Sequence, residues 1–175
     1  MVPPVPPAER RRKQRRGARV LVREGEHVLL MSDSDPGVPG SSWWVLPGGG
    51  LDGDEPTRVA AARELAEETG YVVDPEELRG PIARRVATHG YSDRILVQDE
   101  EIFLLDARRF DVDTSAFTAA EQTRMGGWGW FGPSELAELE IWPAETAELA
   151  RWAGEACRDL GAVEESTVPV ELTSW

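Results

Sequence analysis

Residues 49–71 read GGLDGDEPTRVAAARELAEETGY, a glycine-rich loop followed by one continuous helical pattern. The helix is predicted to end at Gly70, because glycine readily adopts the left-handed conformation that follows a helix. Three glutamates lie in its last turns: Glu64, Glu67 and Glu68. A helix C-terminus carries partial negative charge, so carboxylates are disfavoured there. The sequence therefore gathers anions where local electrostatics opposes them, and an external cation would balance them.

The three glutamates share one face of the predicted helix, which runs over about residues 56–69. At about 100° per residue they fall within an arc of about 100°. The apolar residues fall on the other side: Leu65, Ala62, Ala66 and Val59. Converging carboxylates suit a hard divalent cation such as Mg²⁺, which takes oxygen ligands and keeps room for substrate phosphates. An ordinary acidic face in contact with solvent is the alternative interpretation.

Around this helix the chain is predicted to mix strands and helices. Alternating apolar patterns predict strands at residues 18–23, 27–33, 43–46, 82–91, 95–107 and 127–132. Pro133 is expected to open a short helix, and Pro143 a longer one that runs to about Arg158. Because the elements do not alternate as in βαβ units, an α/β (α+β type) fold with a mixed sheet flanked by helices is favoured over a doubly wound parallel sheet.

The chain of 175 residues suits one domain, predicted at residues 17–160. Residues 1–16, MVPPVPPAERRRKQRR, lack hydrophobic periodicity and are predicted to be a disordered tail. Residues 161–175 are predicted to be a C-terminal tail. Seven of the 19 basic residues precede residue 20, whereas 31 of the 32 acidic residues follow it. An acidic body of this kind argues against a DNA or RNA duplex as the partner.

The location of the protein is predicted from what the sequence lacks. Cys157 is the single cysteine, so an intrachain disulfide is excluded. No apolar run reaches membrane-spanning length or follows the N-terminal charges as in a signal peptide. We therefore expect a cytoplasmic protein without membrane association. The amphipathic helices after Pro133 are expected to pack on the sheet or on a second subunit, which leaves a homodimer open.

The spacing within residues 49–71 resembles the signature of the Nudix hydrolases. In that signature a glycine, five residues, a glutamate and seven residues precede Arg-Glu-aliphatic-x-Glu-Glu-x-Gly-aliphatic. The matching positions are Gly49, Glu55, Arg63, Glu64, Leu65, Glu67, Glu68 and Gly70. Tyr71 departs from the signature, which usually has an aliphatic residue there. WWVLPGG upstream and WGWFGPSEL downstream also resemble the family's flanking segments, so the resemblance covers about residues 18–158.

The resemblance implies the Nudix α/β/α sandwich and hydrolysis of the diphosphate linkage in a nucleoside diphosphate joined to another moiety. Such substrates are small molecules of the ADP-ribose, nucleotide-sugar or (deoxy)nucleoside triphosphate class. The implied ligands of Mg²⁺, or of Mn²⁺, are Glu64, Glu67, Glu68 and the backbone carbonyl of Gly49. Arg63 and Glu55 would orient these carboxylates and so support catalysis. Gly48 and Gly50 would lie against the substrate.

The resemblance leaves the general base open. Glu64 is the first candidate, and Glu100 and Glu101 are rivals because family members often take the base from a downstream segment. Tyr91 and Trp128 are candidates for contact with a nucleobase, although core packing is the usual role of aromatic residues in strands.

Two other functions stand beside hydrolysis. One is a catalytically silent Nudix-like module that senses a nucleotide, although silent members typically lose the glutamates that this chain keeps. The other is an isomerase acting on an isoprenoid diphosphate, which would need a cysteine in the active site. Cys157 is expected to be a small buried residue on the last helix, a poor position for that role.

Overall fold

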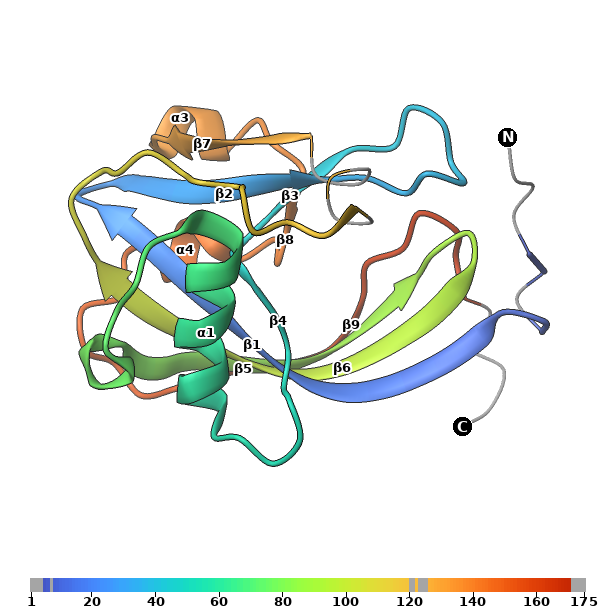
Figure 1. The fold of residues 1–175 in the computed structure, drawn as a ribbon, viewed down its shortest axis with the longest axis horizontal. Helices are drawn as coiled ribbons and strands as arrows, with labels where there is room; N and C mark the ends of the chain where they lie inside the picture. The colour runs from blue at the N-terminus through green and yellow to red at the C-terminus, as the bar shows by residue number, and fades with distance from the viewer. Residues whose placement is uncertain (1–4, 7, 120–121, 123–125, 171–175) are drawn as a thin grey trace.

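The computed structural model describes residues 5–6, 8–119, 122 and 126–170. Its centre is one sheet in the order β8-β3-β2-β1-β6-β5-β9, with β4 beside β1 and β7 beside β2 (Figure 1). The strands are β1 (Arg11–Glu24), β2 (His27–Asp33), β3 (Trp43–Val45), β4 (Gly48–Gly50), β5 (Arg79–Gly90), β6 (Arg94–Asp106), β7 (Gly127–Phe131), β8 (Ile141–Trp142) and β9 (Arg158–Glu164). The helices are α1 (Thr57–Thr69), α3 (Pro133–Leu136) and α4 (Thr146–Leu149), with a 3₁₀ turn η1 (Pro75–Glu77).

Parallel and antiparallel pairs coexist in this sheet, which confirms the predicted mixed architecture. β1 runs parallel to β6 from Arg11 to Arg23 and antiparallel to β2 and β4. β5 runs antiparallel to β6 and parallel to β9. The long strands β1, β5 and β6 curve together, so that the part of the sheet near the β5–β6 hairpin bends away from the layer that contains β2 and β3 (Figure 1).

Helices cover both faces of the sheet, with α1 on one side and α4 on the other (Figure 1). Successive side chains of a strand point to opposite faces, so Val20 and Leu21 of β1 belong to different cores. Val20 belongs to the same buried cluster as Leu65 of α1, and Leu21 belongs to the same buried cluster as Leu149 of α4. Burial of a leucine such as Leu65 contributes about 1.5–3 kcal/mol. Val59, predicted on the same apolar stripe, is 40% exposed.

The predicted C-terminus of α1 is confirmed. Gly70 follows the helix with φ 74°, and its N–H donates to the carbonyl oxygen of Ala66. The last turn of the helix contains no basic residue. The charge at this helix end is therefore balanced from elsewhere in the fold.

The N-terminal boundary differs from the prediction. Residues 11–16, assigned to the tail from sequence, form the first half of β1 and pair in register with residues 94–99 of β6. Backbone hydrogen bonds to a distant strand order this segment, and a search for local hydrophobicity cannot detect them. The domain therefore begins before residue 17. Residues 1–4 and 7 of the predicted tail lie outside the described residues.

The C-terminal part of the fold also differs from the prediction. The helix expected from Pro143 to Arg158 is present only as α4. The chain then turns at Gly154, where φ is 123°, and continues as β9 against β5. Cys157 consequently lies in a loop and is exposed, not buried on a helix. The predicted tail from residue 161 includes the end of β9, and its residues 171–175 lie outside the described part of the chain.

Both ends of the described chain are anchored at the tip of the β5–β6 hairpin. Arg10 is 3% exposed, and its guanidinium donates hydrogen bonds of 2.9–3.0 Å. The acceptors are the carbonyl oxygens of Tyr91, Val168 and Pro169. The N- and C-terminal segments therefore brace the same hairpin tip. Among the described residues, no helix has the length and apolar character needed to cross a membrane.

Candidate active site

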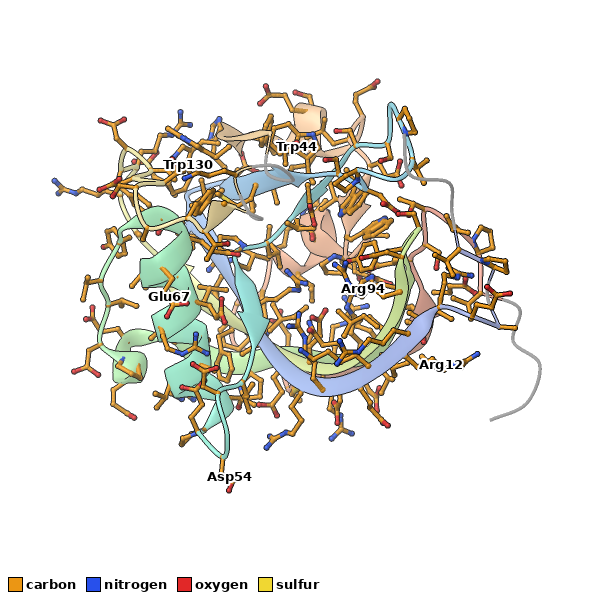
Figure 2. All side chains as sticks on the ribbon, turned by 45° about the vertical axis from the view of Figure 1, so that its right-hand side comes forward. Arg12, Trp44, Asp54, Glu67, Arg94 and Trp130 are labelled. Atoms are coloured by element: carbon orange, nitrogen blue, oxygen red, sulfur yellow. The ribbon has the colours of Figure 1, made fainter. Side chains whose placement is uncertain are left out.

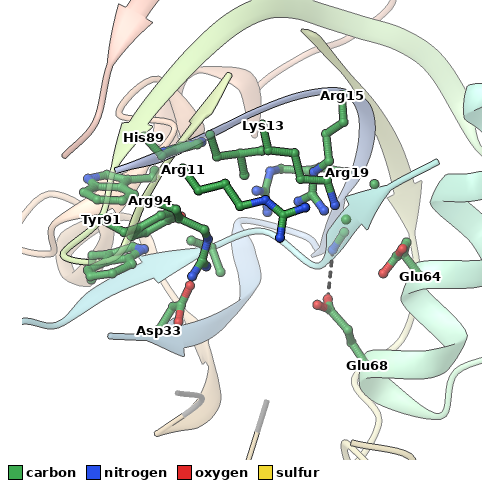
Figure 3. A pocket seen from close by; sticks show the side chains of 17 residues that line it. Arg11, Lys13, Arg15, Arg19, Asp33, Glu64, Glu68, His89, Tyr91 and Arg94 are labelled. Atoms are coloured by element: carbon green, nitrogen blue, oxygen red, sulfur yellow. Dashed lines mark hydrogen bonds between the residues drawn. The ribbon is translucent and has the colours of Figure 1, made fainter. Parts of the chain in front are cut away.

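A cavity of about 530 Å³ lies between the curved strands and β3. Its lining combines glutamates from α1, glycines from β4, basic side chains from β1 and a group of aromatic rings. Figure 3 shows the glutamates facing the basic side chains across this space. The cavity thus brings the motif at residues 49–71 together with the segment that the sequence assigns to a tail.

The glutamates of the cavity are Glu64 and Glu68, one turn apart on α1. The backbone N–H of Gly48 donates to Oε2 of Glu68 at 2.8 Å (Figure 3). A Cβ atom at Gly49 would lie only 2.6 Å from the carboxylate of Glu64, so this approach requires glycine. β4 pairs with β1 while α1 packs on the same strand, and these two contacts bring the glycines to the carboxylates.

Arg63 holds the acidic residues at the edge of the cavity. Its Nη2 donates to Oε1 of Glu55 at 2.6 Å and to the carbonyl oxygen of Gly50 at 3.0 Å. Its Nη1 donates to Glu64 at 3.0 Å and to Glu67 at 3.1 Å. The hydrogen bond from Arg63 lowers the pKa of Glu55. One guanidinium therefore balances part of the negative charge at the helix end, without any metal.

The third glutamate of the motif is placed differently. The Glu67 side chain is 55% exposed, is held by Arg63 and does not line the cavity (Figure 2). Burial raises the pKa of Glu64, and Arg63 opposes that shift. In the described part of the chain, no three His, Cys, Asp or Glu side chains converge into a preformed metal cage.

The donor set nevertheless fits a hard divalent cation. Mg²⁺ is usually held by one or two carboxylates, with water and substrate phosphates completing its shell. Glu64 and Glu68 supply two carboxylates in one cavity, beside the backbone of Gly49. The residues present therefore match a metal that is bound together with its substrate, not one enclosed by protein alone.

The structure argues against both rival bases. Glu100 is fully buried and accepts hydrogen bonds from Arg19 at 2.9 Å and Arg85 at 2.6 Å. Although burial opposes ionisation, these two cations hold the pKa of Glu100 at about 2. Glu101 points to the opposite face of β6 and accepts a hydrogen bond from Thr57. Neither lines the cavity, so neither is placed to take a proton from a water beside the substrate.

The wall opposite the glutamates comes from β1. Every second residue of its first half faces the cavity, as the period of a strand requires. These residues are Arg11, Lys13 and Arg15, followed by Arg19 (Figure 3). Arg15 donates to Gln98 at 2.6 Å, whereas Arg19 is bound by Glu100. The sequence alone does not predict this row, because residues 11–16 read RRKQRR, a basic run without a two-residue period.

Aromatic rings form a further part of the cavity wall. Trp43 and Trp142 stack with centroids 4.2 Å apart, and His89 stacks on Trp142 at 5.5 Å and on Tyr91 at 5.9 Å. Of the two candidates for contact with a nucleobase, Tyr91 lines the cavity, whereas Trp128 lies on β7 outside it. Trp43 is 2% exposed, and its Nε1–H has no hydrogen-bond partner among the described residues. The wall therefore offers flat rings and one buried donor to a ligand.

The buried imidazole in this wall predicts a pH-dependent stability. Burial lowers the pKa of His89 from 6.5 to about 4, so the folded protein keeps the ring neutral at neutral pH. An unfolded chain binds the proton more readily, so this contribution is present above pH 6.5 and is lost as the pH falls toward 4. Over that window it amounts to about 3 kcal/mol.

We expect His89→Gln to flatten the fall in unfolding free energy between pH 6.5 and 4, measured by urea denaturation. His27→Gln is the matched control, because His27 does not line the cavity. This variant should keep the wild-type slope of unfolding free energy against pH. An unchanged slope in His89→Gln would mean that the folded ring takes up its proton as easily as the unfolded one.

Comparison with known protein families gives one clear match. A family model described as NUDIX domain matches residues 13–153 of the chain. The chain is 34% identical over 117 residues to a protein of Bacillus subtilis named putative 8-oxo-dGTP diphosphatase, covering 67% of this chain and 65% of the relative. It is 30% identical over 114 residues to an RNA pyrophosphohydrolase of Erythrobacter litoralis, covering 56% and 64% respectively. The chain thus spans just under two thirds of the length of these curated relatives.

Solved structures agree in fold. A MutT NUDIX hydrolase from Burkholderia pseudomallei superposes with a TM-score of 0.53 at 23% identity. The superposition covers 81% of this chain and 99% of that structure. The mixed sheet between helices is therefore shared with this protein.

Proposed function

The chain belongs to the Nudix family, and on that premise we propose that it is a metal-dependent pyrophosphohydrolase. Its substrate would be a nucleoside diphosphate joined to another moiety, and the bond cleaved would be the diphosphate linkage. The observation that carries this proposal is the placement of Glu64 and Glu68 opposite a row of cations in one cavity. Two relatives carry the names of a diphosphatase and a pyrophosphohydrolase, which supports the reaction class.

The glutamates of the motif would hold the metal. Glu64 and Glu68 face the cavity, Glu67 lies on its flank, and the carbonyl oxygen of Gly49 would add an oxygen ligand. When bound, Mg²⁺ or Mn²⁺ would neutralise phosphate oxygens and orient the diphosphate. Arg63 keeps the carboxylates in position through the hydrogen bonds described above.

A proton acceptor must lie within reach of the attacking water. Water would attack one phosphorus in line, so that a new P–O bond forms while the bridging P–O bond breaks. Glu64 is the carboxylate that we assign to this water, because it lines the cavity whereas Glu100 and Glu101 do not. Gly48 and Gly50 let the backbone approach the phosphates closely.

The rest of the cavity supports a small-molecule nucleotide. Tyr91 and the neighbouring rings offer stacking surfaces for a base, and Trp43 offers an indole N–H without a partner in the described residues. Arg15 lies beside Gly50 and supplies positive charge next to the motif. Substrates of the ADP-ribose or nucleotide-sugar class and nucleoside triphosphates all fit this description.

A substrate panel tests the proposal. The purified protein with Mg²⁺ or Mn²⁺ is incubated with ADP-ribose, nucleotide sugars, nucleoside triphosphates including oxidised ones, and RNA carrying a 5′-triphosphate. Release of monophosphate or inorganic phosphate products supports the proposal. Binding without turnover of any diphosphate compound would favour the silent nucleotide-sensing module. The isoprenoid isomerase is disfavoured because Cys157 is exposed and lies outside the cavity.

Metal binding should also be visible without turnover. We expect saturating Mg²⁺ to raise Tm, because a ligand that binds only the folded state at about 100 times its Kd adds about 2.7 kcal/mol. For a domain of this size, that corresponds to a shift of about 5–10 °C in calorimetry. Glu64→Gln should reduce the shift, whereas Glu138→Gln on the exposed surface should keep it. If saturating Mg²⁺ left the Tm of the wild-type protein unchanged, the result would contradict the assigned metal site.

A further inference from the structure

We propose that Arg11 and Lys13 bind a second phosphate of the substrate, set apart from the diphosphate that is cleaved. The proposal rests on the proposed function, since it concerns the same cavity. It adds a residue-level account of substrate choice, because only molecules with an additional phosphate would use these two cations. Neither residue belongs to the motif at residues 49–71.

Like charges meet in the first half of β1. Arg11 lies opposite Arg94 in the register of β1 and β6, and Lys13 follows on the same face. Like charges directly opposite each other destabilise a sheet. Arg94 pairs with Asp93 at 2.9 Å and lies over the ring of Tyr91. Within the described residues, Arg11 and Lys13 form no ion pair, so their charge is left for an anion.

The opposite face of the same strand shows the contrast. Arg16 lies across from Asp99 in the β1–β6 register, so a carboxylate stands opposite this outward-facing cation. Figure 2 shows Arg12 on the outer side of the curved sheet and Arg94 on its inner side. From residue 20 onward the chain has 12 basic and 31 acidic residues. An inner cluster of cations in so acidic a protein indicates a site for an anion, not general basicity.

Arg11 and Lys13 also lie at a distance along β1 from the glycines of the motif. β4, which carries the motif glycines, lies opposite residues 17–19 of β1. At about 3.3 Å per residue, Lys13 is about 13 Å and Arg11 about 20 Å beyond Gly17 along the strand. Arg15 lies between them and Gly17, next to Gly50, where it serves the cleaved diphosphate. The backbone of Lys13 and Arg11 is therefore set back along the strand from the motif glycines, which places these two cations to meet a further phosphate of a longer ligand.

The aromatic wall lies at the same end of the cavity as these two cations. Lys13 pairs in register with Leu96, and Leu96 pairs with His89, so the three form one row across the sheet. Tyr91 lies at the adjacent hairpin tip, against Arg94. Aromatic rings beside cations that form no ion pair suit a nucleotide whose base stacks on the rings while one of its phosphates reaches Arg11 and Lys13. That phosphate could end a longer phosphate chain or stand alone on the ribose, and the chemistry that Arg11 and Lys13 recognise is the same.

Matched substrates test the proposal and separate the two sources of the phosphate. One pair is ATP and adenosine tetraphosphate, which differ by one phosphate at the end of the chain. The other is ADP-ribose with and without a 2′-phosphate. We expect Lys13→Gln and Arg11→Gln each to lower kcat/KM about 10- to 100-fold for the substrate carrying the extra phosphate in one pair. The partner substrate without that phosphate should change less than twofold. Arg16→Gln, on the outer face, is the matched control.

Binding provides an independent readout. Inorganic tripolyphosphate, followed by calorimetry without metal, should bind the wild-type protein and Arg16→Gln alike, and Lys13→Gln at least about tenfold more weakly. If the ratio of kcat/KM between the two substrates of each pair were the same in wild type and in Lys13→Gln, the proposal would be overturned, whereas the proposed hydrolysis would stand. An effect confined to 5′-triphosphorylated RNA would overturn the small-molecule assignment. If the wild-type protein hydrolysed no substrate but bound tripolyphosphate, and Lys13→Gln lost that binding, the result would support the phosphate subsite and refute the proposed reaction.

Discussion

Glu68→Gln is expected to lower kcat about 1,000-fold. The glutamine keeps the size of the side chain but removes a charge that faces the cavity and accepts a hydrogen bond from Gly48. A catalytic metal contributes several kcal/mol to transition-state stabilisation, and each 1.36 kcal/mol corresponds to a factor of ten in rate. Initial rates at saturating metal and substrate measure this loss directly.

Two variants frame that result. Glu76→Gln removes an exposed carboxylate on η1, outside the cavity, and should keep the wild-type rate. Glu67→Gln should lose less activity than Glu68→Gln, because the Glu67 side chain is half exposed and is turned toward Arg63. If Glu68→Gln retained more than about a tenth of the wild-type kcat, the assignment of Glu68 to the metal would be refuted.

Glu100→Gln is expected to destabilise the fold by about 3–5 kcal/mol. Removal of one partner from a buried ion pair leaves the other charge uncompensated, and here two guanidiniums, those of Arg19 and Arg85, lose their counter-ion. Both side chains remain almost completely enclosed. Urea denaturation measures the change, which corresponds to a fall in Tm of about 10 °C.

The neighbouring residue supplies the control. Asp99→Asn makes the same carboxylate-to-amide change on an exposed position of β6 and should alter stability by less than about 1 kcal/mol. Acid should act in the same sense as the Glu100 mutation. The low pKa of Glu100 means that its contribution is complete above about pH 4.5 and is lost as the pH falls through about 2. Equal stability of the two variants would show that the buried network contributes little.

Part of this structure follows from local sequence. α1 is recognisable because a 3.6-residue pattern, a terminating glycine and fixed spacings coincide within one short segment. Glu64 and Glu68 could therefore be placed on a common face before any coordinates. The mixed sheet could be inferred as well, from the irregular order of strand and helix patterns.

Other parts of the site depend on contacts between distant segments. Nothing within residues 11–16 reveals that β6 lies beside them, because backbone pairing does not require apolar side chains. The ionic partners of Glu100 come from β1 and β5, so its burial could not be predicted from VQDEEIF alone. Trp142 and Trp43 meet only because β8 pairs with β3, at a separation of about a hundred positions along the chain.

The contacts of Arg10, Val168 and Pro169 at the tip of the β5–β6 hairpin limit how the protein can be shortened. A protein cut back to residues 13–153, the span of the family match, would lose Arg10, Arg11 and all of β9. β5 would become an unprotected edge strand, which favours association with other chains. The hairpin tip that carries Tyr91 would lose its guanidinium clamp. Low activity or aggregation of such a shortened protein would reflect the lost contacts and would not test the proposed function of the 175-residue chain.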